Sequence, residues 1–338
     1  MQTMVLFTQT LVRLNLRQII LTLVAFAAIG ISPRANAQIL SEAYSKVLLG
    51  GVHVGYTIQR YEFDPKKKEF VITYFVKTGP KAGDITESVK GRSTSSLKPI
   101  SYQYTQLAGD KAKMIDATFK DDTMSTTVVE NGKRTVLAPR KIPKDAFLSS
   151  FLGYMMLQGK EGIKPQIRYT YNAIAEEDGQ VYQGEAFVAG EESVAGVNSY
   201  KVLNTFMKTN FIYWITPKGE FIASRSPVQQ LSTEVVAGIQ DAIAGLPLNS
   251  ATLNQLFGSV PKGTENAVAK KNQGVPLAAP ATVPAAAPPA APAVEEASTP
   301  RPTKKEILEG AKPPVTNPGK KEGVPAGQGI QLKGGSGQ

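Results

Sequence analysis

Hydrophobic and polar residues alternate along most of the chain with a period of two, which is typical of β-strands that have one buried face. The densest β-branched and aromatic stretch runs from 199 to 225, where three strand-like runs are separated by the turns MKTN and TPKG. Within it, the side chains of Phe211 and Tyr213 point to one side, and those of Ile212 and Trp214 point to the other. Both faces need cover, so the pattern predicts that this stretch is the centre of an antiparallel sheet.

The same alternation predicts the other strands of this sheet. Residues 46–63 are expected to form a short strand, a bulge or bend at Gly50-Gly51 and a longer strand, and the turn DPKKK leads into a partner strand over 70–77. Asn131-Gly132 favours a two-residue hairpin turn because both residues tolerate positive φ. Further strands are predicted at 84–95, 99–107, 111–120, 124–137, 167–175, 180–189 and 228–236.

One segment has a helical period instead. In DAFLSSFLGYMMLQ, residues 145–158, apolar residues recur at i, i+1, i+4 and i+5, Asp145 is placed to cap the first turn, and Gly159 to end the helix. Such a wide apolar stripe must be buried against the sheet. Two short helices, GIQDAIAG and SATLNQLFG, are expected after the last strand. The sequence therefore predicts a mainly β fold, a strongly curved antiparallel sheet or half-barrel packed on one amphipathic helix.

The two ends of the chain differ in composition from the middle. Residues 1–37 combine basic residues, an apolar run and Ala35-Asn36-Ala37, which predicts a signal peptide cleaved after Ala37 and export to a Gram-negative periplasm. An uncleaved anchor is the alternative, but the apolar run is shorter than a membrane span, and no transmembrane segment is expected after cleavage. Residues 261–338 are rich in Pro, Ala and Gly, which predicts a disordered tail and leaves 38–260 as the folded domain.

The composition argues against several kinds of catalytic and metal-binding site. The chain has one histidine and no cysteine, so imidazole or thiolate metal sites and a cysteine nucleophile are not expected, and His53 lies on the polar face of its strand as a surface residue. Acids such as Glu176 and Glu177 could supply a carboxylate pair for glycoside chemistry, but they fall in predicted turns where acids are ordinarily solvated. No phosphate-binding glycine loop is present. No catalytic residue, metal or cofactor is therefore expected.

Charge says little about partners. The net charge is +10, and the basic residues are spread thinly, which suits a solvated surface or weak attraction to anionic envelope polymers. Export argues against nucleic acid as a partner.

Two segments together carry a resemblance. LLGGVHVGYTIQRYEF near the start, and VNSYKV followed by FIYWITPKGEFIASR, resemble a group of uncharacterised exported bacterial β-rich proteins. That group is similar in architecture to periplasmic lipoprotein-carrier and outer-membrane lipoprotein-receptor half-barrels, whose sheet surrounds a helix. The resemblance spans about residues 43–236 and implies the shape, with a cavity in the concave face, but it brings no catalytic motif.

Two functions are consistent with these features. The first is a non-catalytic binding protein that holds an apolar or lipid-like ligand in the concave face of the sheet. The alternative is a cell-envelope scaffold or tether that acts through protein partners and the tail. The oligomeric state is open. The residues predicted to contact the ligand are Tyr56, Tyr74, Phe151, Met155, Ile212 and Trp214.

Overall fold

The structure, a computed structural model, describes residues 37–243 and 245–274, all within the first of the chain's two units, Met1–Thr282. The predicted signal peptide, apart from Ala37, and most of the predicted tail lie outside the described residues. The strands are β1 (Gln38–Leu49), β2 (Val52–Asp64), β3 (Glu69–Thr78), β4 (Ile85–Thr94), β5 (Pro99–Ala108), β6 (Lys111–Lys120), β7 (Thr123–Glu130), β8 (Lys133–Val136), β9 (Arg140–Lys141), β10 (Phe147–Leu148), β11 (Arg168–Ala175), β12 (Gln180–Val194), β13 (Val197–Phe206), β14 (Thr209–Ile215), β15 (Phe221–Ser226) and β16 (Leu231–Val236).

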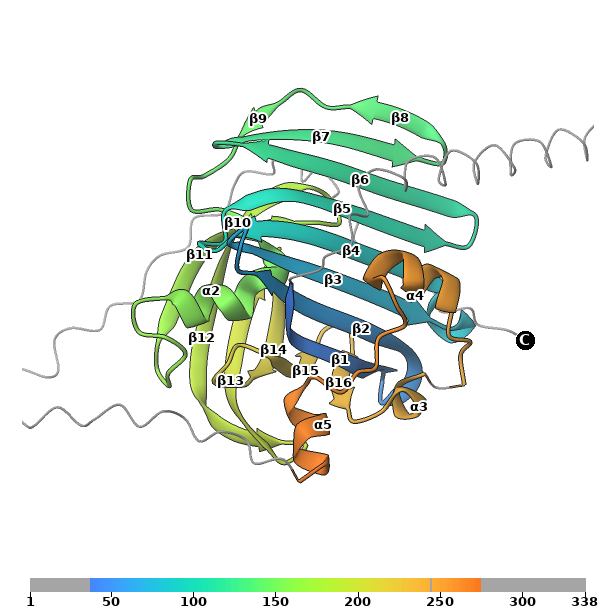
Figure 1. Ribbon diagram of the computed structural model, residues 1–338, viewed down its shortest axis with the longest axis vertical. Coiled ribbons are helices and arrows are strands. Elements are labelled where there is room, and N and C mark those ends of the chain that lie inside the picture. Colours follow the sequence, from blue (N-terminus) through green and yellow to red (C-terminus); the bar gives the residue numbers. More distant parts are fainter. Residues whose placement is uncertain (1–36, 244, 275–338) are drawn as a thin grey trace, which may run out of the picture. The chain divides into compact units, whose positions relative to one another are not determined.

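These strands form one curved sheet (Figure 1). Its order is β10-β11-β12-β13-β14-β15-β16-β1-β2-β3-β4-β5-β6-β7-β8, with β9 paired to β7, so the last and first strands of the chain meet in the middle. Every pairing is antiparallel except that of β10 with β11. Among the described residues the sheet does not close, because β10 and β8 remain as edges. The predicted half-barrel is confirmed. The stretch with Trp214 lies inside the sheet but not at its centre, because β14 is nearer to the β10 edge and the middle is occupied by β16 and β1.

Turn chemistry explains most of the hairpins. Asn131 and Gly132 both have positive φ and join β7 to β8 as predicted. Gly50 and Gly51 also have positive φ, at 57° and 81°, and they form the complete turn between β1 and β2 rather than the predicted bulge or bend. The predicted short first strand is therefore the end of the long strand β1, and the register of β1 with β2 shifts instead between Ile39 and Ser41 and between Val47 and Leu48.

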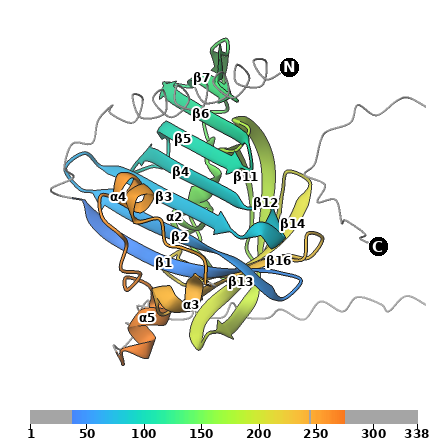
Figure 2. The ribbon, with the colours of Figure 1, turned by 90° about the vertical axis from the view of Figure 1, so that its right-hand side faces the viewer.

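The inner face of the sheet is covered by the segment that contains α2 (Leu152–Gln158) and the short 3-10 helix η2 (Ser149–Phe151). The two halves of the sheet curve toward each other (Figure 2). Side chains from strands of both halves form one buried core around this segment. The rings of Tyr61 and Phe70 lie 5.9 and 6.2 Å from that of Phe151, which packs the segment against β2 and β3. Other core residues include Ile72, Tyr104, Ile115, Leu148, Leu152, Met156, Val188 and Val202.

The helix predicted over 145–158 is correct in its burial but wrong in its start. Asp145 does not cap it; its carboxylate accepts hydrogen bonds from Asn172 instead. Phe147 and Leu148 are extended because they pair with Ala173 and Ile174 at the free edge of β11, and the α-helix begins only at Leu152. The backbone hydrogen-bonding capacity of that sheet edge competes with the first helical turns.

Three more helices cover the outer face of the sheet: α3 (Ile239–Ala242), α4 (Ser250–Phe257) and α5 (Ala267–Asn272). Helices α3 and α4 cover an apolar cluster that includes Tyr56 and Ile58, whereas α5 covers one that includes Trp214. His53 is half-buried rather than a surface residue, since its Nε2 lies 2.9 Å from the carbonyl oxygen of Ala242 in α3. No helix in the described part of the chain is both long and apolar enough to span a membrane.

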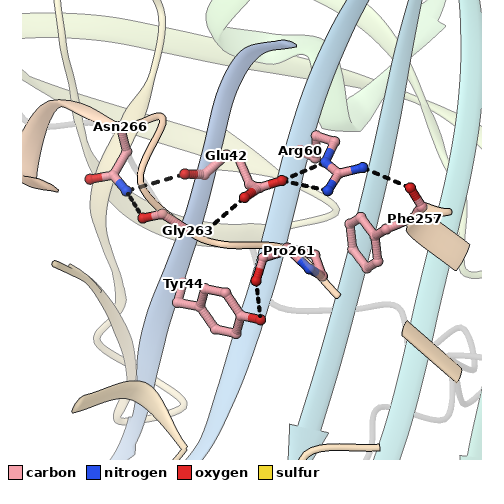
Figure 3. A network of polar contacts seen from close by, with 7 residues as sticks. All are labelled: Glu42, Tyr44, Arg60, Phe257, Pro261, Gly263 and Asn266. Atoms are coloured by element: carbon pink, nitrogen blue, oxygen red, sulfur yellow. Dashed lines mark hydrogen bonds and ion pairs between the residues drawn. The ribbon is translucent and has the colours of Figure 1, made fainter. Parts of the chain in front are cut away.

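A C-terminal strap, residues 257–274, is fastened to the outer face by buried polar contacts (Figure 3). Arg60 and Glu42 are directly opposite on β2 and β1 and form an ion pair with an Nε–Oε2 distance of 2.6 Å. Arg60 donates to the carbonyl oxygen of Phe257 at 2.8 Å, and Glu42 accepts from the amide of Gly263 at 2.7 Å.

Two more contacts complete the attachment of the strap. The Tyr44 hydroxyl donates to the carbonyl oxygen of Pro261, and the Asn266 side chain donates to the carbonyl oxygens of Glu42 and Gly263 while capping α5. The prediction that the disordered tail begins at residue 261 is therefore wrong for residues 261–274. Composition does not reveal this segment because much of its attachment is through the backbone, at the carbonyl oxygens of Phe257, Pro261 and Gly263 and the amide of Gly263.

Candidate functional site

A cavity of about 300 Å³ lies on the inner face of the sheet, beside η2 and the start of α2. Side chains from β1 to β5 line one part of it, and β14 to β16 line another. The turn after β11 adds two acids. The lining residues are Ser45, Thr57, Gln59, Tyr74, Glu87, Val89, Tyr104, Ser149, Ser150, Leu152, Glu176, Glu177, Tyr213, Phe221, Ile222, Ala223, Ser224, Thr233 and Val235. The curvature of the sheet brings these positions together from widely separated parts of the sequence.

The cavity is acidic, because three glutamates line it and none of the described lining residues is basic. Glu176 is 3% exposed and is held by three donors: the hydroxyls of Ser149 and Ser150, at 2.6 and 2.7 Å, and the Ser150 amide at 3.2 Å. Burial raises the pKa of Glu176, and these hydrogen bonds oppose that rise. Because its carboxylate is fully used in fastening η2 to β11, Glu176 is mainly a positioning residue.

Glu87 and Glu177 are held less tightly. Burial raises the pKa of Glu87, while hydrogen bonds with Gln106 and Tyr104 lower it. Burial also raises the pKa of Glu177 to about 7, and repulsion from Glu176, Asp178 and Glu87 adds to this. Glu177 keeps more than a third of its surface accessible although protein surrounds it on most sides, and among the described residues only its own backbone amide donates to it. Its carboxylate oxygens are therefore available to a ligand.

Hydroxyl groups and aromatic rings line the rest of the cavity. Burial raises the pKa values of Tyr74, Tyr104 and Tyr213, so these phenols stay protonated and can donate hydrogen bonds. Ser45 is 9% exposed, and its register partners on β2 and β16, Thr57 and Val235, also line the cavity. No described residue forms a hydrogen bond with the Ser45 hydroxyl.

The six residues predicted to bind a ligand do not gather at one site. Tyr74 lines the cavity, while Phe151 and Met155 belong to the apolar core of the inner face. Tyr56 lies in the outer cluster beneath α3 and α4, and Ile212 and Trp214 lie in or against the outer cluster beneath α5. Alternation shows which side chains of one strand point to the same side. It does not show which side of one strand lies on the same face of the sheet as a given side of another strand.

The three acids of the cavity differ from what their place in the sequence predicts. A turn position predicts solvated side chains for Glu176 and Glu177, yet both line the cavity, and Glu87 lines it from within β4. A usable signal existed for Glu87: it occupies the same alternation phase as Val89 and Gly91, so it points to the side on which apolar residues are buried. An acid in an apolar phase is a candidate for a functional group.

Within the described residues, no group of three or more His, Cys, Asp or Glu side chains could hold a metal ion. No known protein-family model matches the chain, and no curated protein sequence matches it. Among solved structures, the chain is similar to a beta-barrel-like protein of domain of unknown function DUF1849 from Brucella abortus, with a TM-score of 0.39 and 9% identity. That similarity covers 59% of this chain and 98% of the other.

Proposed function

We propose that the protein is an exported, non-catalytic binding protein that holds a small ligand in the cavity on the inner face. The observation that supports this most directly is the cavity itself, which is lined by donors, acceptors and aromatic rings from many elements of one sheet. Its volume of about 300 Å³ lies at the lower end of the range for ligand pockets, so the ligand is small.

The lining favours a polar ligand over the acyl chain expected from the sequence. The apolar part of the inner face is filled by the protein's own side chains, including Phe151, Leu152 and Met156, which are 0%, 5% and 0% exposed. An acyl chain in the cavity would bury the carboxylate of Glu177 with no partner beyond its own backbone amide, and would offer no further partner to Glu87, which is unfavourable for charged groups. A ligand with polar groups would satisfy the same carboxylates.

The other parts of the proposal rest on the sequence. Export is inferred from the signal-like residues 1–37, and the absence of catalysis from a chain with a single histidine and no cysteine. That histidine, His53, contacts α3 and does not line the cavity. The scaffold alternative depends on the tail, most of which lies outside the described residues.

A thermal-shift screen with small water-soluble metabolites tests the binding role. A ligand present at about 100 times its Kd stabilises the folded state by about 2.7 kcal/mol, which raises the Tm by roughly 5 to 10 °C. Ser45→Phe should fill the cavity and abolish the shift, whereas Gln103→Phe on the exposed side of β5 should preserve it. Shifts that survive Ser45→Phe would place binding elsewhere, and a screen without shifts would favour the scaffold.

A further inference from the structure

The charges of the cavity define the class of ligand more narrowly, and this step rests on the proposed function. Glu87, Glu176 and Glu177 share one small space, and no Lys, Arg or His among the described lining residues offsets them. The pKa of Glu177 is raised in part by repulsion from Glu176 and Glu87, so the carboxylates are close enough to interact. A bound cation would relieve this repulsion, whereas a bound anion would increase it.

A second feature of the cavity also indicates a ligand. Ser45 is a residue only 9% exposed that lines the cavity, and no described residue forms a hydrogen bond with its hydroxyl. Its oxygen is not among the fully enclosed unpaired polar atoms of the described residues, so it can reach a partner in the cavity. Polar groups in such largely buried positions usually have a hydrogen-bond partner. A ligand that donates an N–H in the cavity would satisfy this oxygen together with the accessible oxygens of Glu177.

The cation is organic rather than a bare metal ion. No three His, Cys, Asp or Glu side chains of the described residues are placed so that they could hold a metal ion together, and about 300 Å³ is far more space than one ion needs. Four aromatic residues, Tyr74, Tyr104, Tyr213 and Phe221, also line the cavity. Aromatic faces attract organic cations and pack against their carbon atoms.

We propose that the cavity binds an organic ammonium ion, with the charged nitrogen near Glu87 and Glu177 and the alkyl part against the aromatic residues. Glu176 positions η2 at the wall of the site and is not itself free to pair fully with the ligand, because three donors already occupy its carboxylate. The preferred ligands are primary amines small enough for the cavity.

A charge series of similar size tests this directly by isothermal titration calorimetry. The probes are four molecules of similar size. Near neutral pH, 1,4-diaminobutane carries two positive charges and n-butylamine one, 1-butanol is uncharged, and butyrate carries one negative charge. We expect n-butylammonium to bind about tenfold more tightly than 1-butanol, the difference between a charge-assisted and a neutral hydrogen bond. The diammonium should bind at least as tightly, and butyrate should bind most weakly.

Two variants locate the effect. The double variant Glu87→Gln/Glu177→Gln should remove the roughly tenfold preference for n-butylammonium over 1-butanol. Glu130→Gln should retain that preference, since Glu130 is exposed on β7 and does not line the cavity. Near-ultraviolet circular dichroism of each variant checks that it is folded.

The outcomes separate this inference from the proposed function. Equal or tighter binding of 1-butanol or butyrate would overturn the ammonium assignment and leave a cavity that binds small ligands. A preference that persists in the double variant would also overturn it. If no probe binds, the ammonium inference fails, and the metabolite screen decides independently whether the cavity binds another class of ligand.

Discussion

The buried ion pair between Glu42 and Arg60 should be one of the most sensitive points of the fold. Their side chains are only 4% and 7% exposed, and they join β1 and β2 to the C-terminal strap (Figure 3). In Arg60→Met, Glu42 keeps its hydrogen bond from the Gly263 amide but loses its opposite charge. The carbonyl oxygen of Phe257 also loses its donor.

The size of the effect follows from the burial of the pair. Breaking a buried ion pair by removing one partner costs about 3 to 5 kcal/mol, because an uncompensated charge remains inside. For a domain of this length, that loss lowers the Tm by roughly 10 °C. Removing both charges, in Glu42→Met/Arg60→Met, should cost about 1 to 3 kcal/mol less than Arg60→Met alone.

Urea unfolding followed by the fluorescence of Trp214 measures these differences, since Trp214 is the only tryptophan and lies beneath α5 of the strap. Arg92→Met is the matched control. Arg92 pairs with Glu69 at 2.6 Å, but its side chain is 40% exposed, so its loss should cost less than about 1 kcal/mol. Equal costs for Arg60→Met and Arg92→Met would show that burial of the Glu42–Arg60 pair does not set the cost of losing it.

Three further predictions concern the strap, the acids and the packing. A chain covering 38–274 should unfold at the same urea concentration as one covering 38–338, whereas one covering 38–260 should be less stable by several kcal/mol or fail to fold, because it loses α5 and the strap's hydrogen bonds. Equal stability of 38–260 and 38–274 would contradict the role of the strap. The pKa of Glu177 is raised to about 7 from 4.5, so the folded protein keeps a proton there that the unfolded chain releases. The contribution of this group is therefore fully present below about pH 4.5 and lost as the pH rises through about 7. Because the side chain is more than a third exposed, this pH-dependent loss of stability should be only about 1 kcal/mol. Urea unfolding measured from about pH 4.5 to 7 should show the loss in the wild-type protein and not in Glu177→Gln. The same dependence of stability on pH in both proteins would contradict this role of Glu177. Gly91→Ala should cost about 1 to 3 kcal/mol because its Cβ would lie 2.8 Å from Leu148 and 3.0 Å from Ile72, while Gly190→Ala, whose Cβ would meet no atom within 4 Å, should be nearly neutral in the same assay.

Local patterns in the sequence were enough to predict the elements that depend on neighbouring residues. Alternation placed Ile212 and Trp214 on the opposite face of their strand from Tyr213, and Asn131-Gly132 predicted the turn between β7 and β8. These features arise from backbone geometry and side-chain period, which act over a few residues. They also led to the curved sheet around a buried apolar segment.

The features that were missed depend on contacts between distant residues. Phe147 and Leu148 have a helical pattern, but they meet the edge of β11 and become extended. The strap is held through backbone groups that composition does not report. The cavity acids come from β4 and from the turn after β11, which only the closing curvature of the sheet brings together. For this reason the predicted ligand residues were scattered over two faces, with only Tyr74 in the cavity.

Native mass spectrometry of the protein, purified gently from its own cells, shows whether the cavity holds a ligand. We expect an additional mass of a small amine-bearing molecule bound to the intact protein, and we expect this mass to be absent from the spectrum of Ser45→Phe. The same adduct should remain on Gln103→Phe. A wild-type protein that carries no small molecule, or one that carries an acyl lipid equally well in Ser45→Phe, would contradict the claim that the acidic cavity is the binding site.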